Sequence, residues 1–202
     1  MHSGVTIVQK SNTLRGEMNG KTYFHPVDIA LIGVFCALWA ILSLTLGRLS
    51  FALLRLPVLH DFAAFFTLIL VAWATRKFGT AALVGIIGSI MVLLVGGPFV
   101  NMGFAASAIV FDTLLLANRH RLNSSVYSIV ISVLATLVSA YLAGVLIGVF
   151  LMNSPLEWAT VNWALIYWGP WHLVGGIISI AIGFPIIGIL EAANVRKIIS
   201  EG

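Results

Sequence analysis

Charged side chains and cysteine are both scarce in this chain. Only 9% of its 202 residues are Asp, Glu, Lys or Arg, whereas an average soluble domain carries about 25%. A water-soluble globule of this composition is therefore excluded. Cys36 is the single cysteine, which excludes an intrachain disulfide and a CxxC site. Hydrophobic residues make up 60% of the sequence, and this balance is typical of an integral membrane protein.

Signatures of catalysis are absent as well. The sequence contains no HExxH motif, no GxSxG motif and no phosphate-binding P-loop. Its net charge of +4 does not indicate a nucleic-acid partner, because most basic residues flank apolar runs and form no basic face interleaved with aromatic residues. We therefore expect a protein that is not an enzyme, binds no nucleic acid, and holds neither a cofactor nor a metal ion.

Six apolar runs fill most of the chain, and most of them approach the ~20 residues that cross a bilayer as a helix. We expect an all-α membrane protein, a compact bundle of six transmembrane helices over residues 26–197. Residues 1–25 are expected to form a flexible cytoplasmic tail and residues 198–202 a short one. The longer connections, 47–60 and 153–168, are predicted to be external. The helices are predicted near residues 27–46, 61–75, 78–95, 99–118, 126–152 and 170–193.

Basic residues predict the orientation of this bundle. With a cytoplasmic N-terminus, the outside carries only Arg48 and Arg55. Cytoplasmic loops of membrane proteins carry an excess of Lys and Arg, so both termini are predicted to lie in the cytoplasm. The basic residues on that side are Lys10, Arg15, Lys21, Arg76, Lys77, Arg119, Arg121, Arg196 and Lys197.

One carboxylate falls well inside a predicted span. Asp112 lies in the cytoplasmic third of the helix at 99–118, and Arg119 follows seven residues later. Such a group is a functional candidate, because burying it costs at least a few kcal/mol. The favoured interpretation is a structural carboxylate near the membrane interface, with Arg119 within reach, and a proton-coupled site is the alternative.

Polar and aromatic side chains gather at the predicted external ends of the helices. Four of the six Trp residues fall in one short stretch there, whereas an interfacial aromatic belt enriches Trp and Tyr at both surfaces. The asymmetry favours a pocket for a flat, polar heterocycle over a belt. For the two arginines, an acidic side chain, an anionic lipid headgroup and an anionic group of a ligand are all open as partners. The candidate substrate-binding residues are Arg48, Arg55, His60, Asn101, Glu157, Trp158, Asn162, Trp163, Tyr167, Trp168, Trp171 and His172.

Small residues recur at helical spacing on the first predicted helix. They are Ala30, Gly33, Ala37 and Ala40. Small residues at this spacing let two helices approach closely within a membrane. The stripe is expected either to pack inside the bundle or to dock on another membrane subunit.

The whole pattern resembles the substrate-binding (S) component of an energy-coupling factor (ECF) transporter, a prokaryotic vitamin-uptake system. Six compact helices with cytoplasmic ends, a long first external connection and the segment ALIGVFCALWA carry the resemblance. In that segment Gly33 and Ala37 occupy the places of the family's AxxxA motif, which docks on a transmembrane coupling subunit. The resemblance implies a prokaryotic cell-membrane protein that binds a water-soluble vitamin or related heterocycle, thiamine- or pyrimidine-like. Its implied partners are the coupling subunit and two cytoplasmic ATPases.

Two other classes of function stay open. A self-sufficient carrier or small channel needs a polar path through the bundle, and Asp112 alone makes a poor one. A structural or assembly protein of the membrane would use its external aromatic residues only as an interfacial belt.

Overall fold

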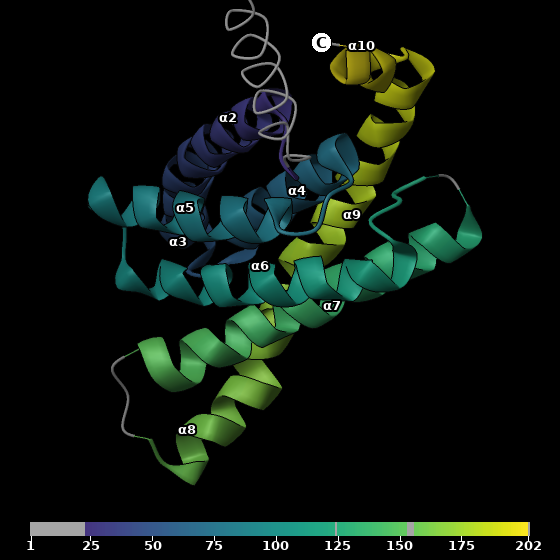
Figure 1. Ribbon diagram of the computed structural model, residues 1–202. Helices are drawn as coiled ribbons and strands as arrows, with labels where there is room; N and C mark the ends of the chain where they lie inside the picture. The colour runs from purple at the N-terminus through teal and green to yellow at the C-terminus, as the bar shows by residue number, and fades with distance from the viewer. Residues whose placement is uncertain (1–22, 124, 153–155, 202) are drawn as a thin grey trace, which may run out of the picture.

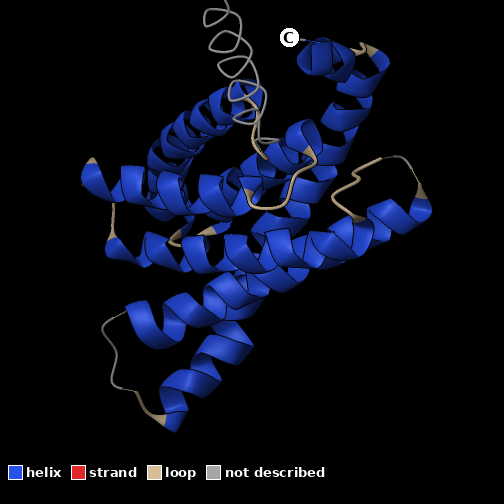
Figure 2. Ribbon diagram, in the orientation of Figure 1, coloured by secondary structure: helices blue, strands red, loops and turns tan. Residues whose placement is uncertain are grey.

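A computed structural model describes residues 23–123, 125–152 and 156–201 of the chain. Within these ranges every regular element is helical and there is no strand, which confirms the predicted all-α class (Figure 1, Figure 2). Most of the expected N-terminal tail, residues 1–22, lies outside the described residues, as do residues 153–155 of the second connection.

The helical elements include three π-helical turns, η1, η4 and η5, and two short 3-10 turns, η2 and η3. In chain order the elements are α2 (Pro26–Leu42), η1 (Ser43–Gly47), α3 (Arg48–Leu54), α4 (Val58–Thr75), α5 (Thr80–Leu94), η2 (Phe99–Asn101), α6 (Met102–Leu114), η3 (Leu115–Asn118), α7 (Val126–Leu146), η4 (Ile147–Leu151), α8 (Trp158–Trp163), η5 (Ala164–Trp168), α9 (Gly169–Ala192) and α10 (Val195–Glu201).

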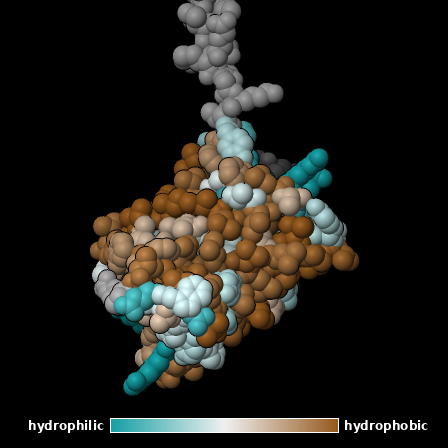
Figure 3. All heavy atoms as spheres, turned by 90° about the horizontal axis from the view of Figure 1, so that it is seen from below, coloured by the Kyte–Doolittle hydropathy of each residue, from teal (hydrophilic) through white to brown (hydrophobic). Residues whose placement is uncertain are grey.

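Several of these helices are long and apolar enough for a membrane bundle. Figure 3 shows an apolar surface over most of one face, with hydrophilic residues gathered in patches towards its edges. A further apolar helix, α5, has 15 residues, or about 22 Å at 1.5 Å per residue, which is shorter than the ~30 Å hydrocarbon core. The five helices that meet the length of a span are Pro26–Leu54, Val58–Thr75, Phe99–Asn118, Val126–Leu151 and Trp158–Ala192.

The first predicted connection, residues 47–60, is largely helical. The first helix runs without a break through η1 and α3 to Leu54. The segment after Gly47 is rich in Leu, Phe and Ala, which favour or tolerate a helix, and no proline occurs before Pro57. Arg55 then adopts a left-handed conformation with φ 54° and ends the helix.

The second predicted connection is also helical. Residues 158–192 form one continuous helix of 35 residues, about 52 Å long at 1.5 Å per residue. The sequence interpretation placed its start near Pro170, because proline favours the first turn of a helix. In the structure Pro170 lies two residues after the end of the π-helical turn η5. The regular hydrogen-bond ladder is already interrupted in this turn, so the missing N–H of Pro170 does not end the helix.

Helix α4 lies at the centre of the bundle. Its membrane-spanning window is 78% buried, and it packs against α2, α5 and α9. Phe65, Leu68 and Ile69 are fully buried on it. In contrast, the windows of the first and last long helices are only 28% buried, so these two helices present broad apolar faces outward.

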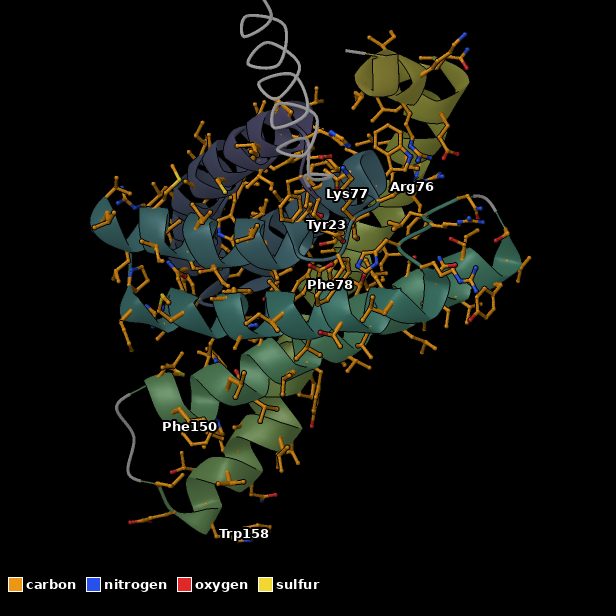
Figure 4. All side chains as sticks on the ribbon, viewed as in Figure 1. Tyr23, Arg76, Lys77, Phe78, Phe150 and Trp158 are labelled. Carbon is orange, nitrogen blue, oxygen red and sulfur yellow. The ribbon has the colours of Figure 1, made fainter. Side chains whose placement is uncertain are left out.

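Ion pairs join several helices at one end of the bundle. Lys77 Nζ lies 2.5 Å from Asp28 Oδ2, which ties the turn after α4 to the start of α2. Arg76 Nη2 lies 3.7 Å from Glu191 Oε1 near the end of α9. Figure 4 shows Arg76 and Lys77 on this end, close to the start of α2. We call this end the basic end, because its turns and α10 carry six of the eight described Lys and Arg residues.

Asp112 is a structural carboxylate at the same end. It is fully buried, and its Oδ2 accepts hydrogen bonds from the backbone N–H groups of Gly79 (2.8 Å) and Ala82 (3.0 Å). Its Oδ1 lies 2.7 Å from His120 Nε2. The carboxylate therefore caps the N-terminus of α5. The partner is His120 rather than Arg119, because Arg119 is exposed in a left-handed conformation that ends the helix.

Candidate functional site

A cavity of about 500 Å³ lies at the opposite end of the bundle from the basic end. Its walls come from η1, α3, the start of α4, the turn between α5 and η2, α6, η4 and the junction of η5 with α9. Small-molecule sites in proteins are concave, mostly apolar and about 300–1,000 Å³ in volume. The cavity therefore has the size and composition of a site for a small ligand.

All three π-helical turns of the described residues reach this cavity. Ser43 and Gly47 of η1, Ile147 of η4 and Trp168 of η5 line its wall. A π-helical turn inserts an extra residue into a helix, and such turns occur frequently at functional sites. Because three of them converge from three different helices, the cavity is the candidate functional site of the fold.

Polar atoms without a partner are concentrated on the cavity wall. Among the described residues, ten buried side-chain nitrogen or oxygen atoms have no hydrogen-bond partner, and five of them belong to cavity-lining residues. A buried polar atom left unpaired costs about 1–3 kcal/mol, so a cluster of them calls for an explanation. These atoms are themselves covered, so a polar ligand in the cavity would satisfy them where the lining side chains turn towards it. The five atoms are Ser43 Oγ, His60 Nε2, Asn101 Nδ2, Trp168 Nε1 and His172 Nε2.

A buried pair fixes the orientation of His172. Its Nδ1 lies 2.6 Å from Asp61 Oδ1, and neither residue is exposed. Because the Nδ1 edge is engaged by Asp61 of α4, the unpartnered Nε2 is the ring nitrogen that remains for a ligand. Asp61 thus positions His172 without lining the cavity itself.

Glycines make room for this arrangement. A Cβ atom added to Gly175 would overlap the Cβ of Asp61, and one added to Gly144 would lie 2.7 Å from His172 Cδ2. A Cβ added to Gly47 would overlap the ring of His60. Only glycine allows α4, α7 and α9 to approach closely enough to hold the two histidines.

Aromatic rings form one side of the cavity. The Phe104 ring lies 4.9 Å from that of His60 and 5.9 Å from that of His172, between centroids. Trp168 lies 5.8 Å from His172. Flat rings arranged in this way suit a flat ligand, which stacks on them or meets their edges.

The structure brings five of the twelve candidate residues together in this cavity. They come from four separate parts of the chain, which only the fold unites. These residues are Arg48, His60, Asn101, Trp168 and His172.

The other seven candidates lie outside the cavity wall. Residues 158–168 are helical, so their side chains point around the helix axis, and Trp168 and His172, four residues apart, share the face that reaches the cavity. Trp163 and Tyr167 stack on Trp168, at 5.4 and 6.1 Å. Trp158 is 78% exposed at the start of α8, at the far end of the helical hairpin that α8 forms with α7 and η4 (Figure 4). The seven residues are Arg55, Glu157, Trp158, Asn162, Trp163, Tyr167 and Trp171.

Thirteen of the eighteen lining residues were not predicted from the sequence, among them Ser43, Phe51 and Phe104. Each of these three lies in an apolar run in which nothing distinguishes a cavity-lining side chain from one that faces lipid. The four-residue spacing of Ser43 and Gly47, two small residues on one helical face, was the available signal for η1.

The small-residue stripe on α2 is mostly exposed. Ala30 and Gly33 are exposed and Ala37 is half-buried. A Cβ added to Gly33 meets nothing within 4 Å, so packing inside the bundle does not require a glycine there. Ala40 is buried in the core, so it packs inside the bundle and is not part of the exposed strip. Ala40 lies about 80° around the helix from Ala30 at 100° per residue.

In the part of the chain that the structure describes, no three His, Cys, Asp or Glu side chains gather where they could hold a metal ion. Comparison of the chain with protein-family models, with curated proteins and with solved structures finds no match.

Two glycines of α9 test the packing behind the site. Gly175→Ala is expected to lower the free energy of unfolding by about 1–3 kcal/mol, because the added methyl group displaces Asp61. Gly188→Ala is the matched control, since an added Cβ meets nothing within 4 Å. It should leave stability unchanged or raise it by about 0.5–1 kcal/mol. Thermal unfolding in detergent measures both, and equal stability of the two variants would contradict the close packing at Gly175.

Proposed function

We propose that this protein is the substrate-binding subunit of an ECF-type importer, which captures a water-soluble vitamin or related flat heterocycle at the external face of a prokaryotic cell membrane. The observation that carries the proposal is the cavity with five unpartnered polar atoms among aromatic rings. Such a site needs a ligand that is flat and offers several hydrogen-bonding groups, and vitamin-like heterocycles have both properties.

The distribution of charge supports an external cavity. Arg76 and Lys77, between α4 and α5, lie at the basic end together with Asp28 and Glu191. The cavity end carries only Arg48 and Arg55 among the described Lys and Arg residues. By the positive-inside rule the basic end is cytoplasmic. With α5 counted as the sixth span, the chain crosses the membrane an even number of times, so both termini lie in the cytoplasm. The cavity then opens to the outside.

The exposed face of α2 supports a membrane partner. Ala30, Gly33 and Ala37 form a shallow strip, flanked by the exposed apolar side chains of Val34 and Ile41. Within a membrane, small residues on an outward face allow another helix to approach closely. In the proposed assembly this strip docks on the transmembrane coupling subunit, which two cytoplasmic ATPases drive.

A self-sufficient proton-coupled carrier is the alternative. The buried Asp61–His172 pair favours it, because ionisable pairs inside a membrane commonly mark proton pathways. Asp112 and Asp28 add no free carboxylate to such a pathway, because Asp112 is bonded to His120 and the Gly79 N–H group and Asp28 is paired with Lys77. The carrier would take up its substrate without ATPases, whereas the importer subunit would not.

Two tryptophans of the last long helix test the binding site. Trp168→Ala is expected to reduce the amount of small molecule that co-purifies with the protein by about tenfold or more, because it removes an N–H donor and an aromatic wall. Trp158→Ala is the matched control, since Trp158 is exposed outside the cavity. Mass spectrometry of the extracted ligand measures both. Equal ligand content in the two variants would remove Trp168 from the site.

A second experiment tests the docking strip. The double substitution Gly33→Leu and Ala37→Leu should abolish co-purification of ATPase subunits from native membranes and stop substrate uptake, while ligand binding is retained. Gly188→Leu is the control, because Gly188 is equally open but lies on α9. If uptake and ATPase co-purification survive the double substitution, the docking assignment is wrong, and uptake in cells without the ATPases would support the carrier.

A further inference from the structure

The charges that face the cavity have one sign. Arg48 is the only Lys or Arg side chain on the described wall, and no Asp or Glu side chain lines it. Arg48 is exposed at the start of α3, and none of the ion pairs among the described residues involves it. Its guanidinium is therefore available to an anionic group at the mouth of the cavity.

The unpartnered polar atoms are also biased towards donation. Asn101 Nδ2 and Trp168 Nε1 can only donate hydrogen bonds. Ser43 Oγ can donate or accept, and the two histidine nitrogens do either according to tautomer. The Asn101 side chain also interacts with His60, so Trp168 Nε1 is the donor that most clearly needs an acceptor atom of a ligand.

The one carboxylate near the cavity is already engaged. Asp61 Oδ1 is paired with His172 at 2.6 Å, and Asp61 is fully buried and does not line the wall. A cationic ligand would therefore find no lining carboxylate and would lie near the guanidinium of Arg48. In a partly apolar site that repulsion is stronger than in water.

We propose, on the basis of the function proposed above, that the ligand is a flat ring compound with an anionic group. The anionic group, a carboxylate in the simplest case, pairs with Arg48 at the cavity mouth, while acceptor atoms of the ring meet Asn101 and Trp168. Arg and carboxylate groups pair in a bidentate geometry that favours this match. The same wall disfavours cationic rings of the thiamine type, because no lining carboxylate is present to pair with them.

Probes that share a ring but differ in charge test the sign of the ligand. Calorimetry on the purified full-length protein would compare nicotinate, nicotinamide and 1-methylnicotinamide, and also orotate, uracil and thiamine. The charge of any co-purifying compound is identified by mass spectrometry alongside. The proposal predicts that the carboxylate of each series binds roughly tenfold more tightly than its neutral counterpart and that the cation does not bind. A co-purifying compound that is an anion would support it equally.

Each other outcome overturns a different part of the account. Preferential binding of a cation, or a co-purifying neutral or cationic compound, overturns the anionic ligand and leaves the binding function intact. A preparation that contains no bound compound and binds none of the probes overturns the proposed function itself.

The two external arginines provide matched variants. Arg48→Gln is expected to weaken binding of the carboxylate ligand roughly tenfold and to remove the preference over its neutral counterpart, with Arg48→Lys retaining part of both. Arg55→Gln should have no effect, because Arg55 lies outside the cavity wall. Unchanged affinity in Arg48→Gln, with binding still lost in Trp168→Ala, would overturn the role of Arg48 while the binding site stands.

Lipid headgroups are the other source of an anionic group for Arg48. Repeating the comparison in nanodiscs of phosphatidylcholine alone, and with added phosphatidylglycerol, separates the two sources. A role in ligand binding predicts the same loss of affinity in both lipids. If Arg48→Gln changes only the thermal stability in phosphatidylglycerol nanodiscs, Arg48 binds lipid and the proposal fails.

Discussion

The buried pair of Asp61 and His172 joins the two helices on which the rest of the structure depends. Asp61 lies on α4, the central helix, and His172 lies on α9, within the longest helix of the chain. Two ionisable groups in an apolar interior are tolerated only when they are paired and hydrogen-bonded. Their 2.6 Å contact fixes how α9 sits against α4, and it also presents one nitrogen of His172 to the cavity. The same pair therefore stabilises the packing of α9 on α4 and sets the orientation of His172 at the cavity.

The two ends of the bundle use polar groups in opposite ways. At the basic end, Asp28 and Asp112 are paired with a Lys, a His and backbone N–H groups. At the cavity end, five polar atoms have no partner and three π-helical turns interrupt the regular helices. Fully satisfied polar networks make a structure rigid, whereas unsatisfied ones mark places where another molecule completes the hydrogen bonding. The basic end anchors the helices, although Arg76 Nε is unpartnered there too, and the cavity end is the candidate binding site.

The sequence predicted the class of the fold and part of the site. The apolar runs at 99–118 and 126–152 matched the helices closely, because Gly-Pro and Ser/Asn turns bound them. The sequence predicts connections at 47–60 and 153–168, because Arg, Pro and Trp residues interrupt the apolar pattern there, but residues 48–54 and 158–168 continue the first and last helices. Spacing of four residues placed Trp168 and His172 on one face correctly. No local pattern could reveal that His172 pairs with Asp61, because 111 residues separate them.

The account depends most directly on whether the cavity holds a small molecule. Native mass spectrometry of the protein purified from cells grown in rich medium answers this question. The account predicts one bound compound per chain, a flat ring structure small enough for a cavity of about 500 Å³, and its release on unfolding. Protein that carries no such compound, and that gains no thermal stability from any water-soluble vitamin, would contradict the assignment of the cavity as a binding site.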